Sequence, residues 1–312
     1  MFAVLIGAAG CKCHQPPSTR PAVKPVEMLK KPAIDLSRGG AGFPLATATL
    51  PQTPAELEAA LRAGYAERLT TPELVRIDIV PETPSDSGHL DIDISHAMVR
   101  ADFTPKQWKQ ENAPAAVLNT GRLSYTAEPL NYQHFAAGMR VVALDARLGI
   151  IPGGDGTFGM SLIDCSTGRA KLRLSMEGLR HSFAQGVQVK QTVAFGIDGV
   201  DMDLTSDNPH ALAVDITVRA RLLLIPAAFR IVGRADVDDA FNVHFNGLTA
   251  TGLDPTGKVI AGIVQTRLDK VNGKAAPLLK MPGDHIKVSD LTIAVGKDLT
   301  FDIGLVGTVA AE

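Results

Sequence analysis

The chain has 312 residues, of which 45% are hydrophobic and 21% charged, and this composition supplies enough apolar surface for a folded core, which excludes a disordered chain. Lys and Arg number 31 against 33 Asp and Glu, for a formal net charge of -2, so the sequence lacks the basic excess that nucleic-acid binding requires. No apolar run approaches the roughly 20 residues of a membrane-spanning helix.

The first residues form an apolar stretch that ends in the small residues Ala8, Ala9 and Gly10, directly before Cys11. Such a pattern is typical of the end of a secretion signal. It resembles the bacterial lipobox, where a signal peptidase cuts before a cysteine that carries lipid. The resemblance implies that residues 1–11 are a signal remnant and that Cys11 is lipidated. The protein is then expected on the periplasmic side of a bacterial envelope, anchored in the outer membrane. The alternative is an apolar tail without a targeting role.

Residues 12–52 are rich in proline and glycine and show no sustained helical or strand period. They predict a tether between the anchor and a folded domain. Folding is expected to begin at Thr53, because Thr53 and Glu56 form a capping box with a proline at the first helical position. The predicted helix ends near Arg68, and its apolar stripe is Leu57, Leu61, Tyr65 and Leu69.

From Leu74 onward apolar and polar residues alternate, as in antiparallel strands with one apolar and one solvated face. The predicted strands are 74–80, 90–94, 142–150, 158–164, 170–176, 187–197, 200–204, 212–224 and 241–245. Leu144, Leu148 and Ile150 are expected to share one face, and Gly153–Gly156 is expected to be a hairpin loop. Several strands exceed the typical ~5–6 residues. The predicted fold class is therefore α+β, with a long curled antiparallel sheet, a half-barrel or barrel, wrapping one or two helices.

After a turn at 254–257 the apolar period becomes helical over residues 258–272. The residues on its apolar face are Ile260, Ile263, Val264, Leu268 and Val271. This face is expected to pack on the apolar side of the sheet, with Gly262 admitting the close approach of a chain or a strand. Residues 286–295 and 299–305 then predict a closing hairpin.

Catalytic motifs are absent from the sequence: there is no GxSxG, HExxH, P-loop or strand-linked GxGxxG. The carboxylate pairs Asp91/Asp93 and Asp201/Asp203 each share a strand face and could in principle hold a cation. Apolar residues at the alternate positions favour a solvated sheet face instead. The histidines are scattered, no cysteine pair completes a zinc site, and Cys165 is interpreted as a small semi-buried residue. The sequence therefore predicts no enzyme, no metal and no cofactor.

The order of elements after residue 240 resembles the tubular lipid-binding (TULIP) superfamily, especially YceB-like bacterial lipoproteins. The resemblance is carried by the helix at 259–272, by Ala276–Pro282, and by the strands at 286–295 and 299–305. It implies a helix lying in a curled sheet, with a lipid or other apolar ligand in the groove between them. On this basis residues 53–312 form one lipid-binding domain, and a subdomain division near 135–240 is left open.

An aliphatic cavity suits acyl chains or a sterol-like ring, because burial contributes roughly 25 cal/mol per Å² without directional chemistry. We therefore expect an envelope lipoprotein that binds or shuttles a lipid. The expected ligand-binding residues are Ile260, Ile263, Val264, Leu268, Val271, Val214, Ile216, Val218, Phe241, Val243 and Phe245. One alternative is a structural or scaffolding lipoprotein with a solid core that recruits another envelope protein. A third is a secreted hydrolase with an unrecognised site.

Overall fold

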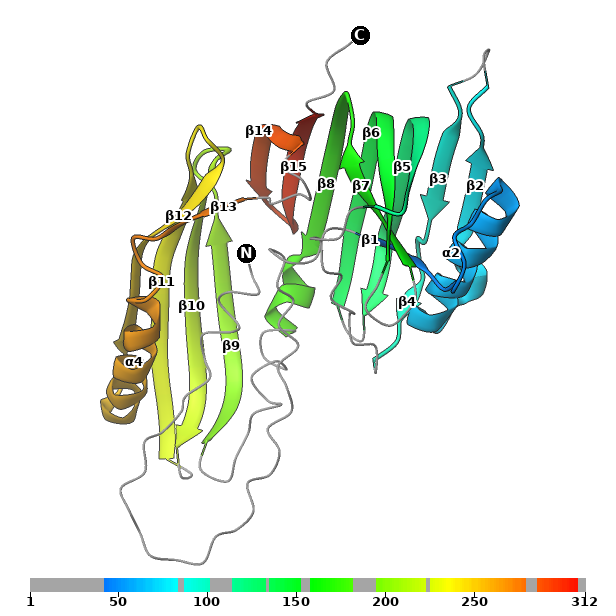
Figure 1. Ribbon diagram of the computed structural model, residues 1–312. Coiled ribbons are helices and arrows are strands. Elements are labelled where there is room, and N and C mark those ends of the chain that lie inside the picture. Colours follow the sequence, from blue (N-terminus) through cyan, green and yellow to red (C-terminus); the bar gives the residue numbers. More distant parts are fainter. Residues whose placement is uncertain are drawn as a thin grey trace, which may run out of the picture.

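The computed structural model describes residues 42–83, 87–101, 114–132, 135–152, 158–181, 195–222, 225–278 and 285–307. The fold is α+β and consists mostly of strands, with few helices (Figure 1). Within these ranges the strands form two sheets rather than the single predicted sheet, and neither of them closes into a barrel.

The larger sheet has ten strands in the part of the chain that the structure describes. Its main path runs in space through β14 (Ile286–Val295), β15 (Asp298–Gly307), β8 (Thr167–Ser175), β6 (Phe135–Pro152), β5 (Ala116–Tyr132), β3 (His89–Asp93) and β2 (Arg76–Val80). Off this path, β7 (Phe158–Asp164) pairs with β6 and with β1 (Gly42–Leu45), and β4 (Met98–Val99) pairs with β5. The pairing is antiparallel except between β3 and β5 and between β4 and β5, which are parallel. The predicted antiparallel character is therefore confirmed for most of the sheet.

The smaller sheet has five described strands, and all pairs between them are antiparallel. In spatial order they are β13 (Ala275–Pro277), β12 (Asn242–Gly252), β11 (Ile225–Val237), β10 (Ala211–Leu222) and β9 (Phe195–Thr205). The closing hairpin β14–β15 joins the larger sheet beside β8. The turn between β9 and β10 contacts the edge of β14. There the Ile293 N–H donates to the Pro209 carbonyl at 2.7 Å, and the Ser206 hydroxyl donates to the Ile293 carbonyl at 3.2 Å.

Helix α2 (Pro54–Arg68) confirms the capping-box prediction, since the Thr53 hydroxyl accepts from Glu56 N and the Glu56 carboxylate accepts from Thr53 N. A short 3-10 turn, η1 (Pro72–Leu74), occupies the start of the expected strand at Leu74 and displaces β2 to Arg76. Helix α2 covers the far end of the larger sheet, next to β1 and β2 (Figure 1).

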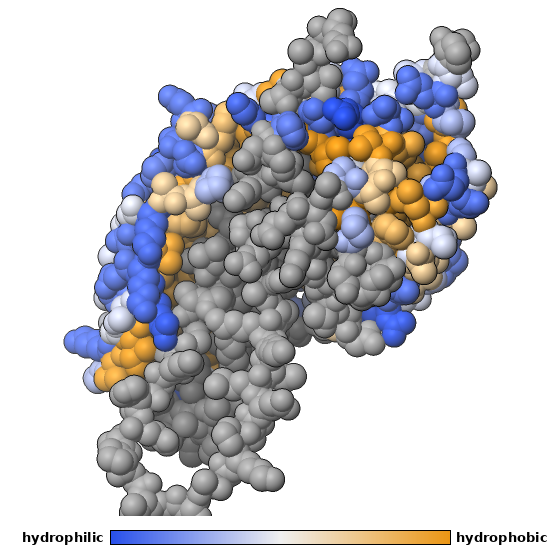
Figure 2. All heavy atoms as spheres, viewed as in Figure 1, coloured by the Kyte–Doolittle hydropathy of each residue, from blue (hydrophilic) through white to orange (hydrophobic). Residues whose placement is uncertain are grey.

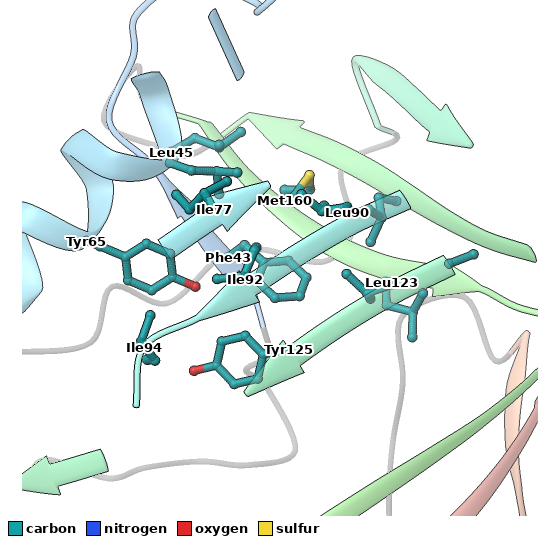
Figure 3. Packing of buried hydrophobic residues seen from close by; sticks show 14 of the residues in the cluster. Phe43, Leu45, Tyr65, Ile77, Leu90, Ile92, Ile94, Leu123, Tyr125 and Met160 are labelled. Atoms are coloured by element: carbon teal, nitrogen blue, oxygen red, sulfur yellow. The ribbon is translucent and has the colours of Figure 1, made fainter. Parts of the chain in front are cut away.

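The core of the larger sheet lies between α2, β1 and the apolar face of β2, β3 and β5 (Figure 3). Leu61, Leu90 and Leu123 are fully buried there, and the rings of Phe43 and Tyr125 meet edge-on with centroids 5.6 Å apart. Phe43 belongs to β1, which lies within the segment 12–52 assigned to a tether. The folded part therefore includes residues 42–52.

Leu144 was expected to share a buried face with Leu148 and Ile150, and this prediction is wrong. Leu144 is 44% exposed, whereas Ala143, Leu148 and Ile150 are buried. Asp145 adopts a left-handed backbone conformation, with φ 47°. Inward-facing positions are odd-numbered before it and even-numbered after it, as expected when one irregular residue interrupts the period of two.

Helix α4 (Pro255–Leu268) begins three residues earlier than predicted, because the Asp254 carboxylate accepts from Gly257 N at 2.6 Å and caps it. The helix lies along the open edge of β12. The Gln265 side chain accepts from Ala250 N at 2.6 Å and donates to the Leu248 carbonyl at 3.2 Å. These two bonds occupy backbone groups of β12 that no strand pairs.

Candidate functional site

The smaller sheet has one strongly apolar face, which we call the inner face. In the registers of β9, β10 and β11, Val218 lies opposite Val200 and Phe229, and Ile216 lies opposite Met202 and Ile231. Because side chains two residues apart share a face, these apolar residues form continuous rows across three strands.

The inner face is continuous with part of the larger sheet. One apolar cluster contains both the inner-face residues and side chains of the closing hairpin, including Leu291, Ile293, Leu299 and Phe301. Half-buried leucines of β8 pack against the same cluster. The cluster therefore spans the junction of the two sheets.

The structure brings together most of the residues expected to bind a ligand. The buried members of the cluster among them are Ile216, Val218, Val243, Phe245, Ile260 and Leu268. The half-buried members that pack against it are Val214, Phe241, Val264 and Val271. Ile263 does not join them, since it is 44% exposed on α4.

The expected role of Gly262 is not observed. A Cβ added at Gly262 would meet nothing within 4 Å. The close approach occurs at Gly257, where a Cβ would lie 1.9 Å from the Ala228 carbonyl oxygen. Helix α4 therefore touches the backbone of β11 through its first turn and leaves Gly262 facing open space.

The opposite face of the smaller sheet is charged, and three ion pairs are seen there among the described residues. Arg219 lies 2.7 Å from Asp201, Arg221 lies 2.8 Å from Asp198, and an ion pair links Asp215 with Arg230. The Arg230 guanidinium lowers the pKa of the Asp215 carboxyl. Because an arginine engages Asp201, this carboxylate is part of a solvated sheet face.

The two carboxylates of the other pair, Asp91 and Asp93, contact different groups. Asp93 accepts from Ser95 N at 2.8 Å and so closes a local turn. Asp91 lies in register with Asp78 of β2, and its Oδ1 atom is buried without a hydrogen-bond partner among the described residues. Within the described ranges, no three His, Cys, Asp or Glu side chains gather in a way that could hold a metal ion.

A cavity of about 350 Å³ lies where β9 meets the end of β8 and the turn of the β14–β15 hairpin. Its lining residues are Ser175, Met176, Glu177, Arg180, Asp203, Leu204, Val295, Gly296, Lys297 and Asp298. Met176 and Leu204 belong to the apolar cluster, and Arg180 Nε donates to the Met202 carbonyl at 3.0 Å. The cavity thus has an apolar base and a mixed charged rim at one end of the inner face.

Several titratable groups in the core of the larger sheet have shifted pKa values. Burial raises the pKa of the Tyr65 and Tyr125 hydroxyls and lowers the pKa of the Arg68 guanidinium. Burial, together with the nearby Asp164 carboxylate, raises the pKa of the Cys165 thiol to about 11. These shifts keep the phenols and the thiol neutral, so none of them is a nucleophile at neutral pH.

No family model, curated protein or solved structure matches the chain. The likeness to the TULIP superfamily therefore rests on the order of elements in the sequence. None of the helices in the described ranges is long and apolar enough to cross a membrane. Cys11 and Gly153–Gly156 lie outside the described residues.

Sequence reasoning missed two parts of this site. The first is the contribution of the closing hairpin to the inner-face cluster, because alternation identifies an apolar face but not the sheet against which it packs. The second is the charged rim. Glu177 and Arg180 precede Lys297 by more than a hundred residues and belong to no motif with it, so only the pairing of β15 with β8 brings them together.

Proposed function

We propose that this chain is a non-enzymatic envelope lipoprotein, anchored through lipidated Cys11, that binds or shuttles a lipid or another apolar ligand. The observation that carries the proposal is the apolar cluster shared by both sheets. Its half-buried aliphatic side chains offer dispersion contacts and few directional groups, which suits an acyl chain or a fused ring.

The mode of binding that we propose is TULIP-like, with the ligand held against the inner face beside α4. Val264 and Val271 on the helix side and Val214 on the sheet side are half-buried and pack against one cluster. The cavity at the sheet junction would receive the polar end of the ligand, because its rim carries both cations and carboxylates.

The test combines lipid analysis with one substitution. Lipid extracted from the purified wild-type protein is identified by mass spectrometry, and the same measurement is made on Val264→Trp. A bulky side chain at a ligand-facing position is expected to lower the bound lipid severalfold and leave the melting temperature nearly unchanged. Thr266→Trp is the matched control, because Thr266 lies on the same helix and is exposed.

The scaffolding alternative makes the opposite prediction. In a filled core, Val264→Trp overpacks and destabilises the protein by roughly 1–3 kcal/mol, and the wild-type protein carries no lipid. That result would overturn lipid binding. Mass spectrometry of the native N-terminus tests the anchor separately, since an unmodified Cys11 would remove it.

A further inference from the structure

The end of the smaller sheet at the start of α4 carries an exposed apolar patch, which we call the apolar tip. It consists of Ile225, Leu253, Val259 and Ile263, whose exposed fractions are 56%, 55%, 60% and 44%. The β10–β11 hairpin, the end of β12 and the first turns of α4 meet there (Figure 1). Figure 2 shows apolar side chains at this end of α4.

The apolar tip is continuous with the inner face. On β11, Ile225 shares a face with Ala227 and Phe229, both of which are buried in the inner-face cluster. On α4, Val259 and Ile263 are four residues apart and therefore lie on one side of the helix. Turns and helix starts in soluble proteins normally present polar residues, so large apolar side chains here call for a partner.

The polar backbone groups behind the tip are already satisfied internally. The Leu253 N–H donates to the Ala228 carbonyl at 2.8 Å. One oxygen of Asp254 accepts from Ala228 N and the other from Gly257 N, each at 2.6 Å. Polar backbone groups must be hydrogen-bonded within the protein before a surface can enter an apolar layer, because hydrocarbon offers no replacement hydrogen bonds.

The charges around the tip balance. Arg221 is paired with Asp198 at 2.8 Å, and the start of α4 carries one acid and one base, Asp254 and Lys258. This balance is complementary to an electrically neutral surface rather than to a strongly charged protein or nucleic acid.

We propose that the apolar tip inserts into the interfacial layer of a lipid bilayer, where the inner face can take up or release its ligand. The inference rests on the proposed lipid-binding function. The length of chain before the fold permits this contact, since residues 12–41 would span about 90 Å in polyproline form at ~3.1 Å per residue. A domain anchored at Cys11 can therefore reach the surface of its own membrane.

The experiment is flotation of the full chain, with serine in place of Cys11, on phosphatidylcholine vesicles at low and high salt. The wild-type protein is expected to float at both salt concentrations, because the contact is apolar. The double variant Val259→Glu/Ile263→Glu is expected to bind at least about tenfold more weakly. Leu144→Glu/Val306→Glu is the matched control, since these residues of the larger sheet are 44% and 41% exposed. It is expected to bind like wild type.

A variant that binds more tightly shows that changes in vesicle binding do not come from misfolding. Val259→Trp is expected to bind vesicles severalfold more tightly, because Trp is favoured at a membrane interface. Failure of the wild type to float, equal loss in the control variant, or loss of all binding at high salt would each overturn the proposal. So would a tip variant that changes only self-association, measured by analytical ultracentrifugation.

Co-purified lipid, measured on the same samples, separates the two proposals. If the tip variant keeps its lipid but loses vesicle binding, both proposals stand. If the wild type floats but holds no lipid, the membrane contact of the apolar tip is supported and the proposed ligand binding is overturned. If the wild type holds lipid but does not float, the proposed ligand binding is supported and the membrane contact of the apolar tip is overturned.

Discussion

Two glycines on helix α4 allow one substitution to be tested in two environments. At Gly262 an alanine Cβ meets nothing within 4 Å, whereas at Gly257 it lies 1.9 Å from the Ala228 carbonyl oxygen and 2.8 Å from its carbon. Both residues are helical, so the backbone preference for alanine is the same in kind. The difference between the two variants therefore measures how closely α4 packs on β11.

The expected changes in the free energy of unfolding have opposite signs. Gly262→Ala is expected to stabilise by about 0.5–1 kcal/mol, because alanine reduces the freedom of the unfolded chain. At Gly257 the added carbon meets backbone that cannot rotate away, so the first turn of α4 must move. Overpacking, with strain on the two hydrogen bonds of Asp254, is expected to destabilise by about 2 kcal/mol or more.

Urea unfolding followed by circular dichroism measures both values, with the slope of the transition as a check that the same surface unfolds. Gly257→Ala is expected to lower the midpoint and Gly262→Ala to raise it slightly. Equal stability in the two variants would refute the close packing of α4 on β11. A loss of stability in Gly262→Ala alone would place the contact on the face of the helix that the sequence first suggested.

Gln265→Leu removes the two side-chain hydrogen bonds to the open edge of β12 and is expected to lower the free energy of unfolding by about 1–3 kcal/mol. Light scattering should also show more self-association, because open strand edges pair with other chains. A variant that stays monomeric and fully stable would contradict this role. The His244 side chain lowers the pKa of the Asp238 carboxyl to about 2, below the unfolded value of about 3.9. The contribution of this pair to the free energy of unfolding is therefore present above about pH 4 and is lost as the pH falls towards 2. The stability difference between wild type and Asp238→Asn, measured by urea unfolding, should shrink over that range. The Cys165 thiol is buried and its pKa is raised to about 11. In the Cys11→Ser/Cys13→Ser variant, this thiol should therefore resist a thiol reagent at pH 8 until urea unfolds the protein. Rapid labelling of the native protein would show that the thiol is accessible.

Local rules account for the elements that the sequence predicted well. The capping box at Thr53 fixes the start of α2, because its two reciprocal hydrogen bonds involve only residues three apart. Alternation of apolar and polar residues predicts β10 and the closing hairpin, since the strand period of two requires no knowledge of partners. The same alternation predicts which residues face the apolar cluster, Ile216 and Val218 among them.

Long-range pairing decided what the sequence left open. The division into two sheets depends on where the closing hairpin pairs, and β15 pairs with β8, a strand more than a hundred residues earlier. The irregular backbone at Asp145, which turns Leu144 outward, follows no residue preference strong enough to be read from the chain. The site at the junction follows from the same pairing, because the pairing of β15 with β8 brings Lys297 close to Arg180, and β9 of the smaller sheet adds Asp203 and Leu204. Sequence thus determines period and caps, which are properties of neighbours. Tertiary structure alone decides registers and sheet junctions, because those depend on the summed burial of residues far apart in the chain.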